Sequence, residues 1–289
     1  MKIPETFISE KNLDNKVKDL LSEKQSDDRD GLAIAVGVRE HGTVKESRIY
    51  AWAPPMKEPK LVRKRDALTF DLCYADNMLY DCGVYKAIYC TLYDKQALVR
   101  TQFTPFSMLE NNGLLIFSQL GDIYYTSLRK SSCEKKVTSR SGWVYALEHH
   151  KNEFYDAGAY GIIESEECYT SSYRITDATM KTKALCSYGG SLYSAGCYTV
   201  KNRTAPKILT DITVHAIRNV STKEEVTRRD SELYTLCSYK NLLLDGGENG
   251  KVKNSFTDNI MFDFGPGMSV RALEPIPSAM VKALIETAQ

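Results

Sequence analysis

The chain has 289 residues, 38 basic and 37 acidic side chains, and 43% hydrophobic residues. This balanced charge gives no general electrostatic attraction to nucleic acid or to a membrane surface. No segment approaches the ~20 consecutive apolar residues that a membrane-spanning helix needs, and the polar N-terminal stretch is unlike a secretory signal. We therefore expect a cytoplasmic protein that works neither in a membrane nor on nucleic acid.

In chain order, the first predicted element is a short amphipathic helix over 12–25, where apolar residues form one stripe behind a capping asparagine. A buried strand starts near residue 31, and another over 49–53 precedes three prolines that end regular structure. The basic run over 57–65 is interpreted as an outer strand or solvated loop, because edge strands commonly carry charge, rather than as an anion-binding edge.

A twelve-residue unit then repeats along the chain. Each copy opens with a leucine, continues through a polar tip of about four residues and closes on small residues or glycine, the pattern of two strands joined by a hairpin turn. Its clear copies are Leu72–Gly83, Leu147–Gly158, Leu185–Gly196 and Leu236–Gly247, and a looser one starts at Leu109. The opening leucines stand at 72, 109, 147, 185 and 236, so the copies are 37, 38, 38 and 51 residues apart.

This period leaves no room for a crossover helix and predicts an all-β fold, a β-propeller of antiparallel four-stranded blades. Blades are expected to start near residues 31, 69, 106, 144, 182 and 233, within one domain over 1–289. Val270–Leu273 repeats the start of the strand at Val144–Leu147, so a closing strand over 269–275 should complete the first blade. We favour six blades; seven would follow if 17–21 formed an inner strand. A terminal helix is expected over 279–287.

The segment Trp143–Ile163 contains the run V-Y-A-L and then F-Y-D-A-G-A-Y-G-I-I. This pattern resembles the degenerate repeats of WD40-like and kelch-like β-propellers, over about Ala67 to Val252. The resemblance implies the propeller fold at the superfamily level and no particular family, and one fold carries many functions.

The longest step between copies contains about 13 extra residues, which we place between Thr199 and Glu232. The stretch Ile212–Ile217 alternates like a strand, whereas Asn219–Asp230 is polar and charged. Insertions in repeat proteins often lie on the binding face, so Asn219–Asp230 is a candidate binding loop. A longer outer hairpin without a binding role is the alternative.

Known catalytic motifs are absent from the sequence, as are metal-ligand spacings, and we predict no cofactor and no metal site. The cysteines recur at repeat positions without the C-x-x-C motif, which favours buried structural thiols. Asp81, Asp156 and Asp245 occupy one repeat position near a turn, where aspartate usually binds backbone donors.

Polar residues that break the repeat are better candidates for a site. Weak catalytic candidates are Asp71, Glu110 and Glu148, expected in or next to inner strands at the central channel. Candidates for binding are His149, His150, Tyr188 and Tyr239, which are expected near hairpin tips.

Two functions remain open. The first is a non-enzymatic propeller that presents a loop face to a macromolecule, with a protein as the expected partner. The second is a propeller hydrolase that acts on a glycan or lactone through carboxylates in the channel, which would have to lie within ~10 Å of one another. A small-molecule or glycan ligand is compatible with either.

Overall fold

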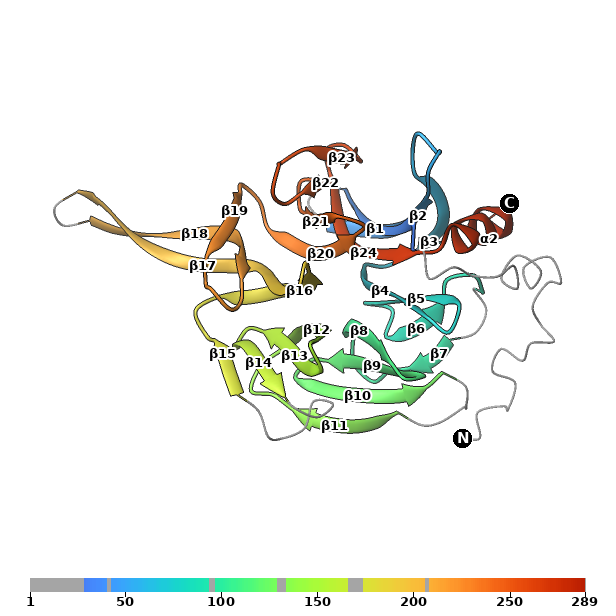
Figure 1. The fold of residues 1–289 in the computed structure, drawn as a ribbon, viewed down its shortest axis with the longest axis horizontal. Coiled ribbons are helices and arrows are strands. Elements are labelled where there is room, and N and C mark those ends of the chain that lie inside the picture. The colour runs from blue at the N-terminus through green and yellow to red at the C-terminus, as the bar shows by residue number, and fades with distance from the viewer. Residues whose placement is uncertain are drawn as a thin grey trace.

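The computed structural model describes residues 29–40, 43–93, 97–128, 134–165, 174–205 and 208–288, which form six antiparallel sheets of four strands each. Figure 1 shows these sheets arranged as blades around a common centre. The predicted six-bladed propeller is confirmed, and the described ranges contain no seventh blade. One short C-terminal helix is present, while the helix expected over 12–25 lies outside the described residues.

We number the blades 1 to 6 and give the strands of each from the axis outwards. Blade 1 consists of β24 (Met268–Ile276), β1 (Gly31–Glu40), β2 (Thr43–Trp52) and β3 (Lys60–Arg65). Blade 2 consists of β4 (Thr69–Ala75), β5 (Met78–Gly83), β6 (Ala87–Cys90) and β7 (Ala97–Arg100). Blade 3 consists of β8 (Pro105–Asn111), β9 (Leu114–Gln119), β10 (Asp122–Ser127) and β11 (Lys135–Ser139).

The last three blades follow the same order. Blade 4 consists of β12 (Val144–His150), β13 (Glu153–Gly158), β14 (Gly161–Ser165) and β15 (Arg174–Asp177). Blade 5 consists of β16 (Lys181–Tyr188), β17 (Ser191–Ala205), β18 (Ile208–Asn219) and β19 (Glu225–Arg229). Blade 6 consists of β20 (Leu233–Tyr239), β21 (Leu242–Gly247), β22 (Lys251–Asn254) and β23 (Ile260–Asp263).

Blade 1 closes the ring by joining the two ends of the described chain. Its innermost strand β24 pairs antiparallel with β1, from Gly31 opposite Ile276 to Val38 opposite Met268. The helix α2 (Ser278–Thr287) follows β24 directly and buries Met280 and Leu284, which belong to the same apolar cluster as residues of blades 1 and 2. Closure therefore ties both ends to one sheet and covers a strand edge that would otherwise be exposed.

The repeated glycine at the end of the twelve-residue unit is required by close backbone approach. In blade 2, a Cβ atom on Gly83 would lie 2.0 Å from the carbonyl oxygen of Leu68, the residue just before β4. The equivalent distances are 1.9 Å from Gly158 to Trp143, 2.1 Å from Gly196 to Lys181 and 2.2 Å from Gly247 to Glu232. No side chain fits there, so the glycine fixes how the second strand passes the start of the first.

Three junctions between blades contain the same buried ion pair. An arginine at or just after the end of an outer strand donates hydrogen bonds to an aspartate in the second strand of the next blade. The pairs are Arg65–Asp81 at 2.8 Å, Arg140–Asp156 at 2.6 Å and Arg229–Asp245 at 2.7 Å. The expectation that these aspartates bind backbone donors is wrong. Their carboxylate oxygens accept hydrogen bonds from guanidinium and hydroxyl groups instead.

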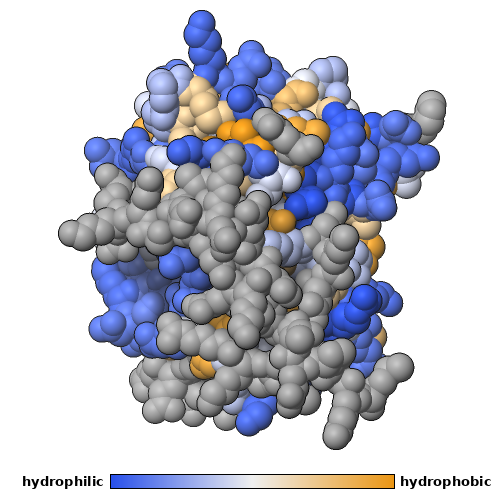
Figure 2. All heavy atoms as spheres, turned by 90° about the vertical axis from the view of Figure 1, so that its right-hand side faces the viewer, coloured by the Kyte–Doolittle hydropathy of each residue, from blue (hydrophilic) through white to orange (hydrophobic). Residues whose placement is uncertain are grey.

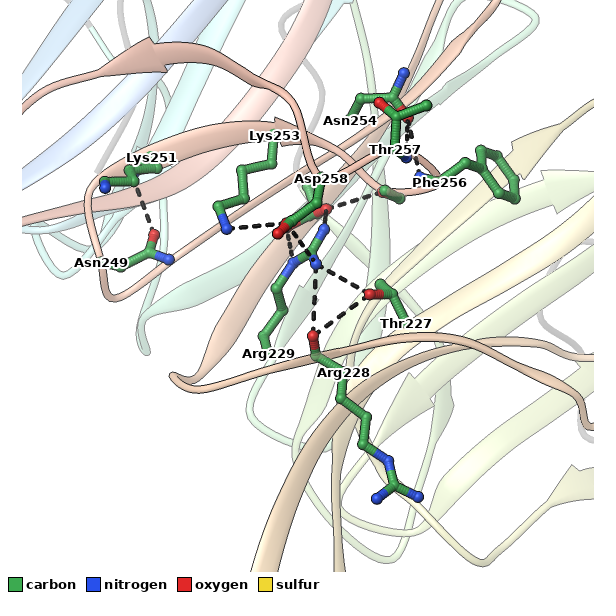
Figure 3. A network of polar contacts seen from close by, with 12 residues as sticks. Thr227, Arg228, Arg229, Asn249, Lys251, Lys253, Asn254, Phe256, Thr257 and Asp258 are labelled. Atoms are coloured by element: carbon green, nitrogen blue, oxygen red, sulfur yellow. Dashed lines mark hydrogen bonds and ion pairs between the residues drawn. The ribbon is translucent and has the colours of Figure 1, made fainter.

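Figure 3 shows the surroundings of Arg229, the cation of the third pair. Arg229 also contacts Asp258 of the β22–β23 turn at 2.9 Å, and Lys253 binds the same carboxylate at 2.9 Å. The neighbouring Arg228 points away from this network, in contact with Glu225. Blades 5 and 6 are therefore joined by a network centred on Arg229.

The extra residues of blade 5 form a lengthened hairpin. β17 and β18 pair continuously from Tyr193 opposite Asn219 to Ala205 opposite Ile208, and Figure 1 shows the hairpin projecting away from the blades. The Asn219–Asp230 stretch is therefore not the insertion, because it contains β19, the fourth strand of the blade, and Arg229. The longer outer hairpin, our alternative, is what the structure contains.

The basic run over 57–65 forms a loop segment and then the outer strand β3. This agrees with its interpretation as an outer strand or loop. Arg63 donates to the backbone oxygens of Thr91 and Leu92, and Arg65 binds Asp81, so both are used within the fold.

The side that carries α2 is turned to the viewer in Figure 2, and its described atoms are mostly hydrophilic with small hydrophobic areas. In the described part of the chain, no helix has the length and apolar character of a membrane span.

We predict that Arg229→Met lowers the free energy of unfolding by about 3–5 kcal/mol, because it leaves the buried Asp245 carboxylate without its cation. Arg228→Met is the matched control: its ion pair with Glu225 is exposed and screened by solvent, so its loss should change the stability little. Urea unfolding monitored by tryptophan fluorescence compares the two. Equal losses in both variants would show that the buried pair does not stabilise the junction.

Candidate functional site

The six inner strands surround a central channel with a volume of ≈ 260 Å³. Each inner strand of blades 2 to 6 has a register irregularity near its start, and the pairing of β24 with β1 has one as well. Such a bulge adds a residue that no partner opposes and turns its side chain in a new direction. In five of these strands the added residue is Phe70, Tyr145, Lys183, Tyr234 or Arg271, and all five line the channel.

These bulged residues stand two positions before the repeated leucine, at the end of the channel where the inner strands begin, which we call the start mouth. The opposite end, near the hairpin turns, is the tip mouth. The two ends differ in chemistry. Cationic and aromatic side chains surround the start mouth, whereas the residues after the leucine include Glu110, Glu148 and Glu274.

The channel carboxylates bind backbone N–H groups of neighbouring strands. Asp71 accepts hydrogen bonds from Leu72 at 2.9 Å and from Met108 of blade 3 at 2.7 Å. Glu274 accepts one from Tyr74 of blade 2 at 3.0 Å, and the Ser107 hydroxyl accepts one from Leu147 of blade 4 at 3.1 Å. Apart from the Leu72 contact, which lies within β4, each of these bonds ties one blade to the next at the axis.

The remaining two carboxylates also accept hydrogen bonds from backbone N–H groups. Glu148 accepts a hydrogen bond from the N–H of His149 at 3.1 Å and interacts with the backbone of Ser187 in blade 5. Glu110 accepts one from Gly113 in its own hairpin turn at 2.9 Å. The three predicted catalytic candidates thus line one channel, and each serves as a backbone acceptor there.

Burial raises the pKa values of three of these carboxyl groups into the neutral range, so part of each population is protonated near pH 7. Desolvation raises the pKa of Asp71 to about 7, that of Glu148 to about 7 and that of Glu274 to about 8. Mutual repulsion raises the pKa of Glu274 further, while its backbone bond and Arg29, whose guanidinium lies 3.7 Å away, lower it. The channel therefore gains negative charge as the pH rises through 7 to 8.

The predicted binding residues lie towards the tip mouth. His149 is exposed and stacks on Phe154 with ring centroids 4.7 Å apart, and the His150 Nδ1 lies 3.0 Å from the Ser187 hydroxyl. Tyr188 is half-buried against Phe256, with centroids 5.7 Å apart. Tyr239 is only 3% exposed and donates to the backbone oxygen of Asp30, so it joins blade 6 to the beginning of the described chain.

Sequence reasoning missed three residues of the channel: Lys183, Arg271 and Glu274. The match of Val270–Leu273 to Val144–Leu147 contained the signal, because it aligns Arg271 with Tyr145 and Glu274 with Glu148. Among the described residues, no group of three or more histidine, cysteine or acidic side chains has the geometry to hold a metal ion.

Comparison with solved structures gives a fold and no closer relationship. The chain is similar to the WD40 β-propeller domain of Doa1, with 14% identity, a TM-score of 0.54 and 88% of each chain covered. A computationally designed protein, Ika8, matches at 15% identity and a TM-score of 0.48, over 84% of this chain and 90% of its own. No protein-family model and no curated protein matches the sequence. The chain therefore has a WD40-like propeller fold, and its function has to be argued from its own residues.

We predict that Glu274→Gln stabilises the protein increasingly as the pH rises. The folded-state pKa of about 8 exceeds the ordinary value of 4.5, so folding favours the protonated form and wild-type stability falls between these two pH values. Glutamine keeps the oxygen that accepts from Tyr74 and cannot ionise. Thermal unfolding midpoints at intervals from pH 4 to 9 should show the variant's advantage smallest near pH 4 and largest near pH 8. A difference that does not change with pH would contradict the raised pKa.

Proposed function

We propose that the protein is a non-enzymatic binding module that docks another protein on the face around the start mouth. The observation that supports this choice is an exposed apolar surface at the entrances to blades 2 to 4. Large apolar side chains there are Val84 at 46% exposure, Phe103 at 43% and Trp143 at 50%. Trp143 and Phe103 lie on the connections that lead into inner strands. The backbone N–H of Val84 donates a hydrogen bond to the carbonyl oxygen of Leu68, just before β4.

Trp143 belongs to a contiguous set of rings, the aromatic arc, formed by Phe70, Phe106, Trp143 and Tyr145. Phe106 lies at its centre, with ring centroids 5.0 Å from Phe70, 5.5 Å from Trp143 and 5.7 Å from Tyr145. Phe70, Phe106 and Tyr145 also line the channel, so the arc runs from the start mouth onto the outer surface. Aromatic residues that lie partly exposed on rigid strands are typical of the centre of protein interfaces.

The hydrolase alternative has less support from the same channel. Acid–base hydrolysis needs one carboxyl group to reach the leaving oxygen and a second to act from another side. Asp71, Glu110 and Glu148 are instead engaged with backbone N–H groups, and the first two of these contacts are short, at 2.7 and 2.9 Å. A role as structural acceptors accounts for these three carboxylates without a reaction.

The tip mouth provides the comparison surface. The predicted binding residues His149, His150 and Tyr188 lie there with Phe256, which is 49% exposed. Their side chains are held by contacts within and between the blades. We keep this surface as the second docking candidate.

We predict that Trp143→Ser weakens partner binding by about 30-fold or more, the effect of removing an aromatic hot spot of at least ~2 kcal/mol. Affinity capture from native lysate with quantitative mass spectrometry compares wild type, Trp143→Ser and the tip-face control His149→Ser. Specific proteins should be retained by wild type and control and lost with Trp143→Ser.

Loss with His149→Ser alone would move the docking site to the tip face. Absence of any specific protein in the wild-type sample, together with turnover in a panel of glycosides and lactones, would favour the hydrolase.

A further inference from the structure

The start mouth has a cationic half opposite the aromatic arc. Lys183 of blade 5 and Arg271 of blade 1 flank Tyr234 of blade 6, and all three line the channel. The Arg271 guanidinium carbon lies 3.6 Å from the centroid of the Tyr234 ring, and the Lys183 Nζ lies 4.0 Å from that of Tyr145. The aromatic faces hold both cations in place at the mouth.

Within the described ranges, Arg271 has no carboxylate within ion-pair distance, although such pairs exist for its neighbours: Glu248 binds Arg39, and Glu232 lies 3.6 Å from Lys183. Its Nε donates a hydrogen bond to the Ser269 hydroxyl at 3.0 Å, and its guanidinium also interacts with the Tyr234 hydroxyl. A guanidinium carries five N–H donors, so donors remain for an incoming acceptor.

Burial imposes a cost on both cations. Desolvation lowers the pKa of Arg271 and that of Lys183 from their ordinary values, with Glu232 acting in the opposite direction on each. A partly desolvated guanidinium without a counter-ion is unfavourable, and an anion that binds it removes that cost. The mouth is therefore arranged to gain from an anionic group.

We propose that the start mouth binds an acidic peptide segment of the partner, with one carboxylate on Arg271 and Lys183 and an adjacent large apolar side chain on the aromatic arc. This inference rests on the proposed function and names the chemistry of its ligand. A planar carboxylate accepts two parallel hydrogen bonds from one guanidinium.

The geometry favours a peptide over a free small anion. The ≈ 260 Å³ channel holds about one side chain, while Trp143, which stacks on Phe106, continues the apolar surface outwards from it. A chain that enters the mouth with one residue and lies on the arc with the next uses both features. A single unpaired guanidinium also matches one carboxylate better than a doubly charged phosphate, which usually recruits several arginines.

The probe is the peptide acetyl-Gly-Glu-Phe-Gly-amide, titrated into the ¹⁵N-labelled full chain and followed by NMR at low and at physiological salt. We expect the glutamate peptide to bind with a dissociation constant in the millimolar range or below. The analogue with glutamine in place of glutamate should bind about 10-fold or more weakly, because it loses a charge-assisted hydrogen bond. Arg271→Gln and Lys183→Gln should each weaken binding of the glutamate peptide about 10-fold or more. Arg228→Gln, on the exposed outer strand of blade 5, is the matched control and should bind as wild type does.

The thermal unfolding midpoint separates this role from a structural one. Because Arg271 forms no ion pair with a described residue that the substitution would break, Arg271→Gln should leave the midpoint unchanged or raise it. A lowered midpoint with unchanged peptide binding would overturn the proposal. Equal affinity for the glutamate and glutamine peptides would also overturn it, and tighter binding of inorganic phosphate than of the peptide would assign the site to a free anion instead.

Failure of the carboxylate anchor can be distinguished from failure of the proposed docking face. Proteins captured by wild type and lost with Trp143→Ser, but retained by Arg271→Gln, would leave the docking face in place and remove the carboxylate anchor. Peptide binding that depends on Arg271, without any captured protein that depends on Trp143, would leave the anion site and remove the docking face.

Discussion

The structure depends on how six inner strands satisfy their backbone groups at the axis. Each inner strand pairs on one side only, so its other edge faces the channel without a further strand, and buried N–H groups there need acceptors. Asp71, Ser107, Glu148 and Glu274 supply those acceptors across four junctions between blades. The polar residues that interrupt the repeat are thus required by the closed ring itself.

This requirement explains why the channel resembles a catalytic site in composition. Carboxylates gather at the axis because backbone donors converge there, and their burial raises the pKa values of three of them to about 7 or 8. Raised pKa values are common at functional sites, but structural networks produce them too. Farther from the axis, the Arg–Asp pairs at three alternate junctions hold the blades together. The start mouth differs from both, because Arg271 forms no ion pair with any acidic side chain in the described part of the chain.

The sequence predicted the fold well because the propeller repeats. The leucine, the polar tip and the closing glycine recur for physical reasons that act within one blade, so their spacing revealed the strands and the number of blades. The site was harder to predict, since contacts between blades depend on residues distant in sequence. Asp81 was misread because its partner Arg65 belongs to the preceding blade. Arg271 aligns with aromatic and basic residues of other copies, and only the ring places Lys183, Tyr234 and Arg271 side by side.

Hydrogen–deuterium exchange of the protein, alone and with its captured partner, tests the central claim most directly. The claim is that the start face binds and the channel carboxylates are structural. The predicted result is protection of the segments that enter the inner strands, 102–107, 140–146, 181–185 and 268–272. Protection confined to the hairpin tips at 75–78, 148–152, 187–191 and 239–242 would contradict it, because binding would then take place at the opposite mouth.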